Sequence, residues 1–198
     1  KADYAIDSVY QKTKALLSRY PKTIDETKRY LEDKVTTNQD IDKIIHKLVQ
    51  YHFLDDEQYV LQYFERTFHL NLNGPNKIIY ELKHKGIDDS LLQRLHQKMN
   101  ESAIQHNLNS LFDKKLPSLS SRPKAKAMLL MKQFLYQKGY ELNDCDAFVS
   151  KRAHLFSTVE NELLMIEKDY QKSLKKYRDS SLSDYDIKSK IISSLMAK

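Results

Sequence analysis

The chain has 198 residues, and 33 Lys and Arg against 27 Asp and Glu give it a formal net charge of +6. It contains three glycines, four prolines and one cysteine. Because β-turns and phosphate-binding loops use Gly and Pro heavily, this composition argues against β-sandwiches, β-barrels and Gly-looped nucleotide folds. The single cysteine excludes a disulfide scaffold and a cysteine-rich zinc site, and it predicts a protein of the reducing cytoplasm. No apolar run reaches the ~18 residues of a membrane span, so we expect no membrane partner.

Apolar residues recur every three or four positions along the chain, which is the spacing of one helix face. Ile41, Ile44, Ile45, Leu48 and Val49 show this spacing clearly. No segment alternates with period two, so we expect no strands. The predicted helices cover residues 4–19, 23–35, 39–53, 55–70, 75–85, 88–99, 101–116, 122–138, 142–155, 158–178 and 183–198.

Several helix ends are marked by residues that suit them. Thr23 stands three residues before Glu26, which is the spacing of a capping box. Gly86 and Gly139 each follow a lysine, as expected of a left-handed residue just after a helix with a basic last turn. Other candidate start residues are Asp55, Pro75, Asp88, Ser102, Asn143 and Ser183.

The chain repeats a unit of three helices. The second helix of each unit ends in a similar way, with lysines 34, 85, 138 and 198 spaced by 51, 53 and 60 residues. One such unit buries little by itself, but stacked units share a continuous core. The sequence therefore predicts an all-α protein in which tandem three-helix repeats form an elongated, curved array of either hand. The predicted units are residues 1–54, 55–100 and 101–156, followed by a partial repeat at 157–198.

The sequence contains no recognisable catalytic apparatus. It has no P-loop, dinucleotide Gly-box, His-Glu-x-x-His or nucleophile elbow, and no two of its seven histidines are spaced as metal ligands on a helix. Cys145 lies at a predicted helix start, exposed or half-buried, without a nearby His or Lys to activate it. Helix capping explains Asp55 and Asp56 better than an acid site does. We therefore predict a binding protein with no enzyme activity, metal, cofactor or small-molecule substrate.

The segment from Lys114 to Lys138 is the strongest electrostatic feature, because it carries seven basic residues and no acid. Two interpretations remain open. The segment is either a solvated face that meets acids nearby in space, or a surface for phosphates or an acidic partner.

Thirteen tyrosines are present, and most are expected in the core because they lie on or beside apolar stripes. Tyr51, Tyr59, Tyr63 and Tyr80 belong to this group. Tyrosines that border basic residues are instead expected to make surface contacts. These are Tyr20, Tyr136 and Tyr140.

The segment from Phe53 to Ile87 resembles the central signature of the RecX family of recombinase regulators. Residues 54–57 read Leu-Asp-Asp-Glu, and residues 74–87 match the family's Gly-Pro-x-x-Ile-x-x-Glu-Leu-x-x-Lys-Gly-Ile. Ile79 and Tyr80 take places where the family often carries Arg or Lys, and Val35 stands where the other units carry Gly. The residues that carry the structural signature are Leu54, Asp55, Asp56, Gly74, Pro75, Ile78, Leu82, Gly86 and Ile87.

The resemblance implies a regulatory protein that binds the RecA nucleoprotein filament and suppresses strand exchange, ATP turnover and the co-protease role in recombination, DNA repair and the SOS response. Some members of the family also bind DNA, which makes single- or double-stranded DNA a second implied partner. One alternative is a helical repeat protein that binds nucleic acid independently of RecA, and another is a scaffold for some other protein. The candidate residues for binding RecA or DNA are Arg66, Lys77, Lys83, Lys85, Arg122, Lys124, Lys126 and Lys132.

Overall fold

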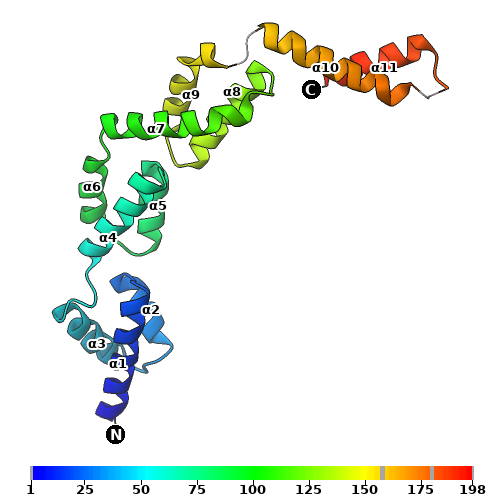
Figure 1. Ribbon diagram of the computed structural model, residues 1–198. Coiled ribbons are helices and arrows are strands. Elements are labelled where there is room, and N and C mark those ends of the chain that lie inside the picture. Colours follow the sequence, from blue (N-terminus) through cyan, green and yellow to red (C-terminus); the bar gives the residue numbers. More distant parts are fainter. Residues whose placement is uncertain (1, 157–158, 179–180, 198) are drawn as a thin grey trace. The chain divides into compact units, whose positions relative to one another are not determined.

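A computed structural model describes residues 2–156, 159–178 and 181–197 (Figure 1). Within these residues the chain forms eleven α-helices and no strand, so the predicted all-α class is confirmed. The chain divides into two compact units. The first contains residues 1–110 and 137–141, and the second contains residues 111–136 and 142–198.

The first unit holds six complete helices and most of a seventh. Their ends agree with the predicted ones to within three residues, except that the helix predicted over 55–70 changes type after Phe64. Residues Glu65–Leu70 form a π-helical turn, in which the Thr67 hydroxyl donates to the Tyr63 carbonyl at 2.7 Å. The helices are α1 (Ala2–Arg19), α2 (Ile24–Glu32), α3 (Asn38–Gln50), α4 (Asp56–Phe64), α5 (Pro75–His84), α6 (Asp89–Lys98) and α7 (Glu101–Lys115).

The second unit begins near the end of α7 and contains four further helices. The helix predicted over 142–155 ends early at Ser150, and a short 3₁₀ turn follows at Ala153–Leu155. Two predicted helix ends, residues 158 and 198, lie outside the described residues. The helices are α8 (Lys124–Gln137), α9 (Leu142–Ser150), α10 (Val159–Tyr177) and α11 (Asp184–Met196).

The helix starts follow the capping rules in most cases. Thr23 forms the predicted capping box with Glu26, and each residue accepts a hydrogen bond from the other's backbone at 3.1 Å. Two predicted caps are wrong. Asn100, rather than Ser102, caps α7 by accepting from the Ala103 backbone, and Asn143 lies inside α9. The predicted caps that the structure contains are Asp55, Asp88 and Ser183, and Pro75 occupies the first turn of α5.

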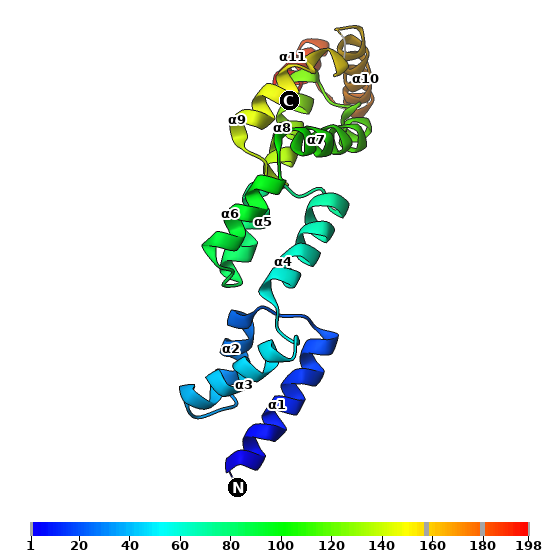
Figure 2. The same cartoon turned by 90° about the vertical axis from the view of Figure 1, so that its left-hand side faces the viewer.

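The first unit has two separate apolar cores. One gathers α1, α2 and α3, which lie side by side in both views (Figures 1 and 2). Leu31 and Leu48 are fully buried in it. The second core is drawn from α4, its π-helical extension, α5 and α6, with Ile78 and Leu82 fully buried. Each core therefore combines the apolar stripes of neighbouring helices, as helix packing requires.

The second unit packs around aromatic rings. Phe112 of α7 contacts Phe148 of α9 and Phe156 edge-on, with ring centroids 5.8 and 5.6 Å apart. Cys145 is fully buried on the same face of α9 as Phe148 and Val149, so the expected exposed or half-buried thiol is wrong. The helical spacing of these residues places the thiol inward, where a cysteine behaves as a small apolar side chain.

Candidate interaction surfaces

Most signature residues of the 53–87 segment build the fold. Leu54, Ile78, Leu82 and Ile87 are buried in the two cores of the first unit. Asp55 caps α4 by accepting from the Gln58 backbone at 3.0 Å. These side chains therefore position the surface rather than form it.

The end of α5 is fixed on the start of α2 by a half-buried polar contact. The Thr23 hydroxyl donates to the Lys85 carbonyl at 2.5 Å, and the Lys85 ammonium lies 2.7 Å from Glu26 Oε1. Burial alone would raise the pKa of Glu26. Hydrogen bonds from Lys85 and from the Thr23 backbone, together with the positive charge of Lys85, outweigh burial and hold the pKa of Glu26 below its ordinary value. Burial would likewise lower the pKa of Lys85, but its bond to Glu26 raises it. The charge of Lys85 is therefore engaged within the fold.

The start of α4 meets the start of α2 through Asp56. Its Oδ1 accepts from the Ile24 backbone at 2.9 Å, so the carboxylate satisfies one of the free N–H groups at the start of α2. Burial raises the pKa of Asp56, and the nearby charges of Asp55 and Asp25 add to the rise, although the bond from Ile24 opposes it. Asp56 is thus a structural acceptor rather than an acid site.

Gly86 allows the α5 end to approach α2 closely. Its φ is +74°, a left-handed conformation, and a Cβ atom there would overlap the Asp25 side chain. Only glycine combines this dihedral angle with so little space. The prediction that a left-handed glycine follows the end of this helix is confirmed. Gly86 also leaves the space in which the end of α5 packs against α2.

The turn after α8 is fixed on the start of α5 through two more glycines. The Gly74 backbone donates to the Lys138 carbonyl at 2.7 Å, and the Asn76 backbone donates to the Gly139 carbonyl at 3.0 Å. A Cβ atom on Gly74 would lie 2.6 Å from the Tyr140 nitrogen, so glycine is required at this close approach.

The tyrosines divide differently from the expectation. Tyr140 is only 1% exposed and its hydroxyl donates to the Leu72 carbonyl at 2.9 Å, so the surface role expected of it is wrong. Tyr51 and Tyr80, which were expected in the core, are 57% and 63% exposed. They lie on the outer sides of their helices, because apolar neighbours already fill the inner faces. Tyr63 is buried as expected, whereas Tyr20 and Tyr136 are exposed as expected.

Three candidate cations of the first unit remain at the surface. The Arg66 guanidinium lies over the Tyr63 ring, 5.6 Å from its centroid. Lys77 is half-exposed, and Lys83 is exposed with its ammonium 4.0 Å from Asp89. The attraction between two exposed charges at this distance is weak, so Lys83 stays available to a partner.

The segment from Lys114 to Lys138 acquires acids from elsewhere in the fold. The Lys132 ammonium lies 2.9 Å from Asp146 Oδ1, and the Lys124 backbone donates to Glu162 Oε1 at 2.8 Å. The Lys115 ammonium lies 5.3 Å from the Phe134 ring centroid. The solvated-face interpretation therefore holds for part of the segment.

The ammonium groups of three lysines of the segment have no acidic partner among the described side chains. Among the side chains that the structure describes, no carboxylate lies within 4.0 Å of the ammonium groups of Lys114, Lys124 or Lys126. Arg122 is exposed beside them in the sequence. We name these four residues the α7–α8 basic segment, and it is the strongest candidate in the second unit for an anionic partner.

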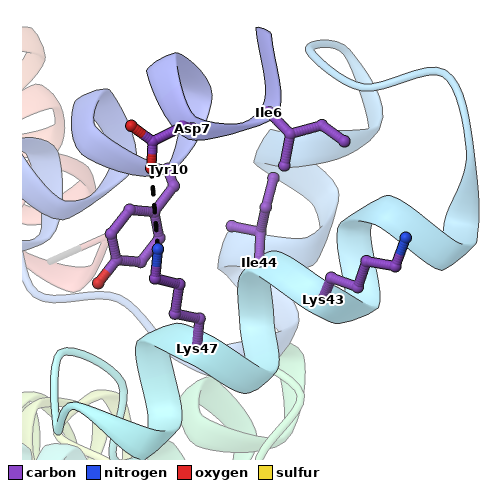
Figure 3. A pocket seen from close by; sticks show the side chains of 6 residues that line it. All are labelled: Ile6, Asp7, Tyr10, Lys43, Ile44 and Lys47. Atoms are coloured by element: carbon purple, nitrogen blue, oxygen red, sulfur yellow. Dashed lines mark ion pairs between the residues drawn. The ribbon is translucent and has the colours of Figure 1, made fainter. Parts of the chain in front are cut away.

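A shallow hollow of about 190 Å³ lies between α1 and α3 (Figure 3). Ile6 and Ile44 point toward each other across it, and the Lys47 ammonium lies 3.7 Å from Asp7 Oδ1 and 4.1 Å from the Tyr10 ring centroid. Lys47 and Asp7 already interact with each other there, and among the lining side chains that the structure describes no nucleophile has a base beside it.

The described part of the chain contains neither a metal-binding cluster nor a membrane-spanning helix. No group of three or more His, Cys, Asp or Glu side chains there is arranged to hold a metal ion. None of its helices has the length and apolar character needed to cross a membrane.

No protein-family model matches the sequence. The chain is 28% identical over 148 residues to the regulatory protein RecX of Clostridium tetani, an alignment that covers 72% of this chain and 68% of the relative. It is 25% identical over 193 residues to the regulatory protein RecX of Oceanobacillus iheyensis, which covers 98% of this chain and 70% of the relative.

The fold is also found in a solved structure. The crystal structure of RecX from Lactobacillus salivarius superposes with a TM-score of 0.67 and 23% sequence identity, covering 79% of this chain and 100% of that chain. The all-α helical repeat array is therefore a fold that this chain shares with a solved protein.

Proposed function

This chain belongs to the RecX family, and we propose that it is a regulatory protein that binds a RecA filament in the cytoplasm and lowers its recombinase, ATPase and co-protease activities. The observation that carries the proposal is the similarity to regulatory proteins named RecX, which extends over 98% of the chain in one relative. Regulation by binding needs no catalytic group, which agrees with the lack of a catalytic motif in the sequence.

The surface supports binding to a long, repetitive partner. Candidate cations lie on several helices of both units rather than in one pocket. Because a filament repeats the same surface many times, weak contacts made by successive helices add through a high effective concentration. We propose that the contacts are made by Arg66, Lys77, Lys83, Arg122, Lys124 and Lys126, whereas Lys85 and Lys132 serve the fold through their ion pairs with Glu26 and Asp146.

The test is a titration of RecA ATP hydrolysis on single-stranded DNA with this protein. We expect hydrolysis to fall as the protein is added in modest amounts relative to RecA. The double variant K124E/K126E is expected to inhibit less than a control double variant, K98E/K151E, which makes the same change of charge at two exposed lysines elsewhere. Unchanged hydrolysis across the whole titration would overturn the proposal.

A second candidate function is nucleic-acid binding without RecA. The observation that favours it is the α7–α8 basic segment, because Lys114, Lys124 and Lys126 have no carboxylate partner among the described side chains. Neutralising phosphates releases counterions, so binding to a single strand should weaken with salt by a slope near −0.7 per phosphate. K124E/K126E should then flatten that slope by about 1.4. Salt-independent binding, or no binding, in the absence of RecA would remove this candidate.

A further inference from the structure

The outward side of α5 carries aromatic and basic side chains that the fold leaves at the surface. Ile78 and Leu82 occupy the inner side of the same helix and are fully buried. Five other residues share one face of the helix, because four of them lie three or four positions from the fifth, Tyr80. This face, which we name the α5 outer face, consists of Asn76, Lys77, Tyr80, Lys83 and His84.

Two rings of the α5 outer face hold each other in place. The Tyr80 and His84 rings have centroids 4.1 Å apart and an angle of 41° between their planes. The Nδ1 atom of His84 lies 3.0 Å from the Tyr80 carbonyl oxygen, and because a carbonyl only accepts, Nδ1 donates its hydrogen there. Tyr80 nevertheless stays 63% exposed. The helix therefore presents a large, oriented aromatic surface to solvent.

The charges around this ring are positive. Lys77 and Lys83 stand three residues before and after Tyr80, and no carboxylate with a described position lies within 4.0 Å of the Lys77 ammonium. Lys83 reaches Asp89 only at 4.0 Å, with both side chains exposed. The Asn76 amide, at the start of this face, donates to Glu141 Oε2 at 2.9 Å. Two cations therefore flank the exposed ring.

We propose that the α5 outer face binds single-stranded nucleic acid, with one base stacked on Tyr80 and the adjoining phosphates contacted by Lys77 and Lys83. An unpaired base exposes its π-face, so it can stack on a tyrosine, whereas the bases of a duplex are stacked on one another. An acidic protein surface would also pair with the lysines and can pack against a tyrosine ring, so the strand-binding test below separates it from a nucleic acid. The site lies apart in sequence from the α7–α8 basic segment and does not require RecA.

The absence of tryptophan from the chain allows a direct test. In the variant Tyr80→Trp, the new indole is the only one present and reports on its own surroundings. An oligothymidine strand is expected to quench its fluorescence, because a stacked base covers the ring. The matched control Tyr51→Trp, at a similarly exposed tyrosine directly after α3, is expected to keep its fluorescence. A duplex of the same length is expected to quench neither variant.

Binding measurements complete the test. Tyr80→Ala is expected to bind the strand roughly 5- to 150-fold more weakly, which is the effect of losing one stacked base. Tyr80→Phe should bind like the wild type, because it keeps the ring. A strand with abasic sites should bind the wild type and Tyr80→Ala equally. The proposal is overturned by unquenched Tyr80→Trp together with wild-type affinity of Tyr80→Ala. It is also overturned if Tyr80→Ala weakens inhibition of RecA without any change in strand affinity, since the face would then contact protein.

Discussion

The turn after α8 gives the sharpest test of the packing, through Gly139. Its φ is +99°, and a Cβ atom there would overlap Lys77 Cβ and lie 2.8 Å from the Lys77 backbone nitrogen. The same turn accepts two backbone hydrogen bonds from the start of α5, given by Gly74 and Asn76. Gly139→Ala therefore imposes a strained dihedral angle and displaces the turn at the same time.

The expected loss of stability follows from these two effects. A left-handed conformation costs a residue with a Cβ atom about 1–2 kcal/mol. Displacing the turn also breaks two backbone hydrogen bonds, each with a net worth of about 0.5–1.5 kcal/mol. The free energy of unfolding should thus fall by about 2–5 kcal/mol. In a chain of this size, 1 kcal/mol lowers the melting temperature by about 2–4 °C, so we expect a decrease of at least about 4 °C.

A urea titration followed by circular dichroism, together with a thermal scan, measures this change. Gly139→Asn separates the two effects, because Asn tolerates a positive φ but still carries a Cβ atom. We expect the Asn variant to be destabilised as well, since the contact with Lys77 persists. A Gly139→Ala variant with the wild-type urea midpoint would refute the fixed position of the turn on α5.

Other predictions concern the core of the first unit and its half-buried carboxylates Glu26 and Asp56. Leu82→Ala is expected to cost about 2–5 kcal/mol, because Leu82 is fully buried, and a melting curve like that of the partly exposed Leu61→Ala would contradict this. Glu26→Gln is expected to destabilise the protein near pH 7, because the folded pKa of Glu26 is lowered and the stability that it contributes is present above its unfolded pKa. The difference between the variant and the wild type should shrink as the pH falls through the folded pKa, and a difference that does not change with pH would contradict the reasoning. Asp56→Asn is expected to stabilise the protein near pH 7, because burial raises the pKa of Asp56 and the amide keeps an oxygen acceptor. This gain in stability should vanish as the pH falls through the raised pKa. Equal urea midpoints of the variant and the wild type at pH 7 would contradict the reasoning.

Features that depend on neighbouring residues were predictable from the sequence. The helical spacing of apolar residues, the capping box at Thr23 and the left-handed glycines at 86 and 139 all involve groups within a few positions of one another. Such local rules apply before any long-range contact forms. The repeat boundaries and the elongated, curved array involve contacts between units, and they stay predictions.

Predictions about single side chains failed where a distant segment decided the outcome. Tyr140 borders a basic residue in the sequence, yet its hydroxyl reaches the Leu72 carbonyl 68 residues earlier and the ring is buried. The burial of Cys145 and the exposure of Tyr80 were decided by which side of each helix is covered by neighbouring helices. Amphipathic spacing identifies a buried face, but it does not place every side chain at the edge of that face.

By itself, the sequence determined that this protein is all-α, where most of its helices begin and end, and that it resembles the RecX family, because these properties rest on local spacing and on a continuous motif. Only the tertiary structure decided which lysines can meet a partner. Lys85 pairs with Glu26, which lies 59 residues away, whereas Lys77 beside the exposed Tyr80 pairs with no described carboxylate. The physical reason is that an ion pair depends on distance in space, which the order of residues along a chain does not specify.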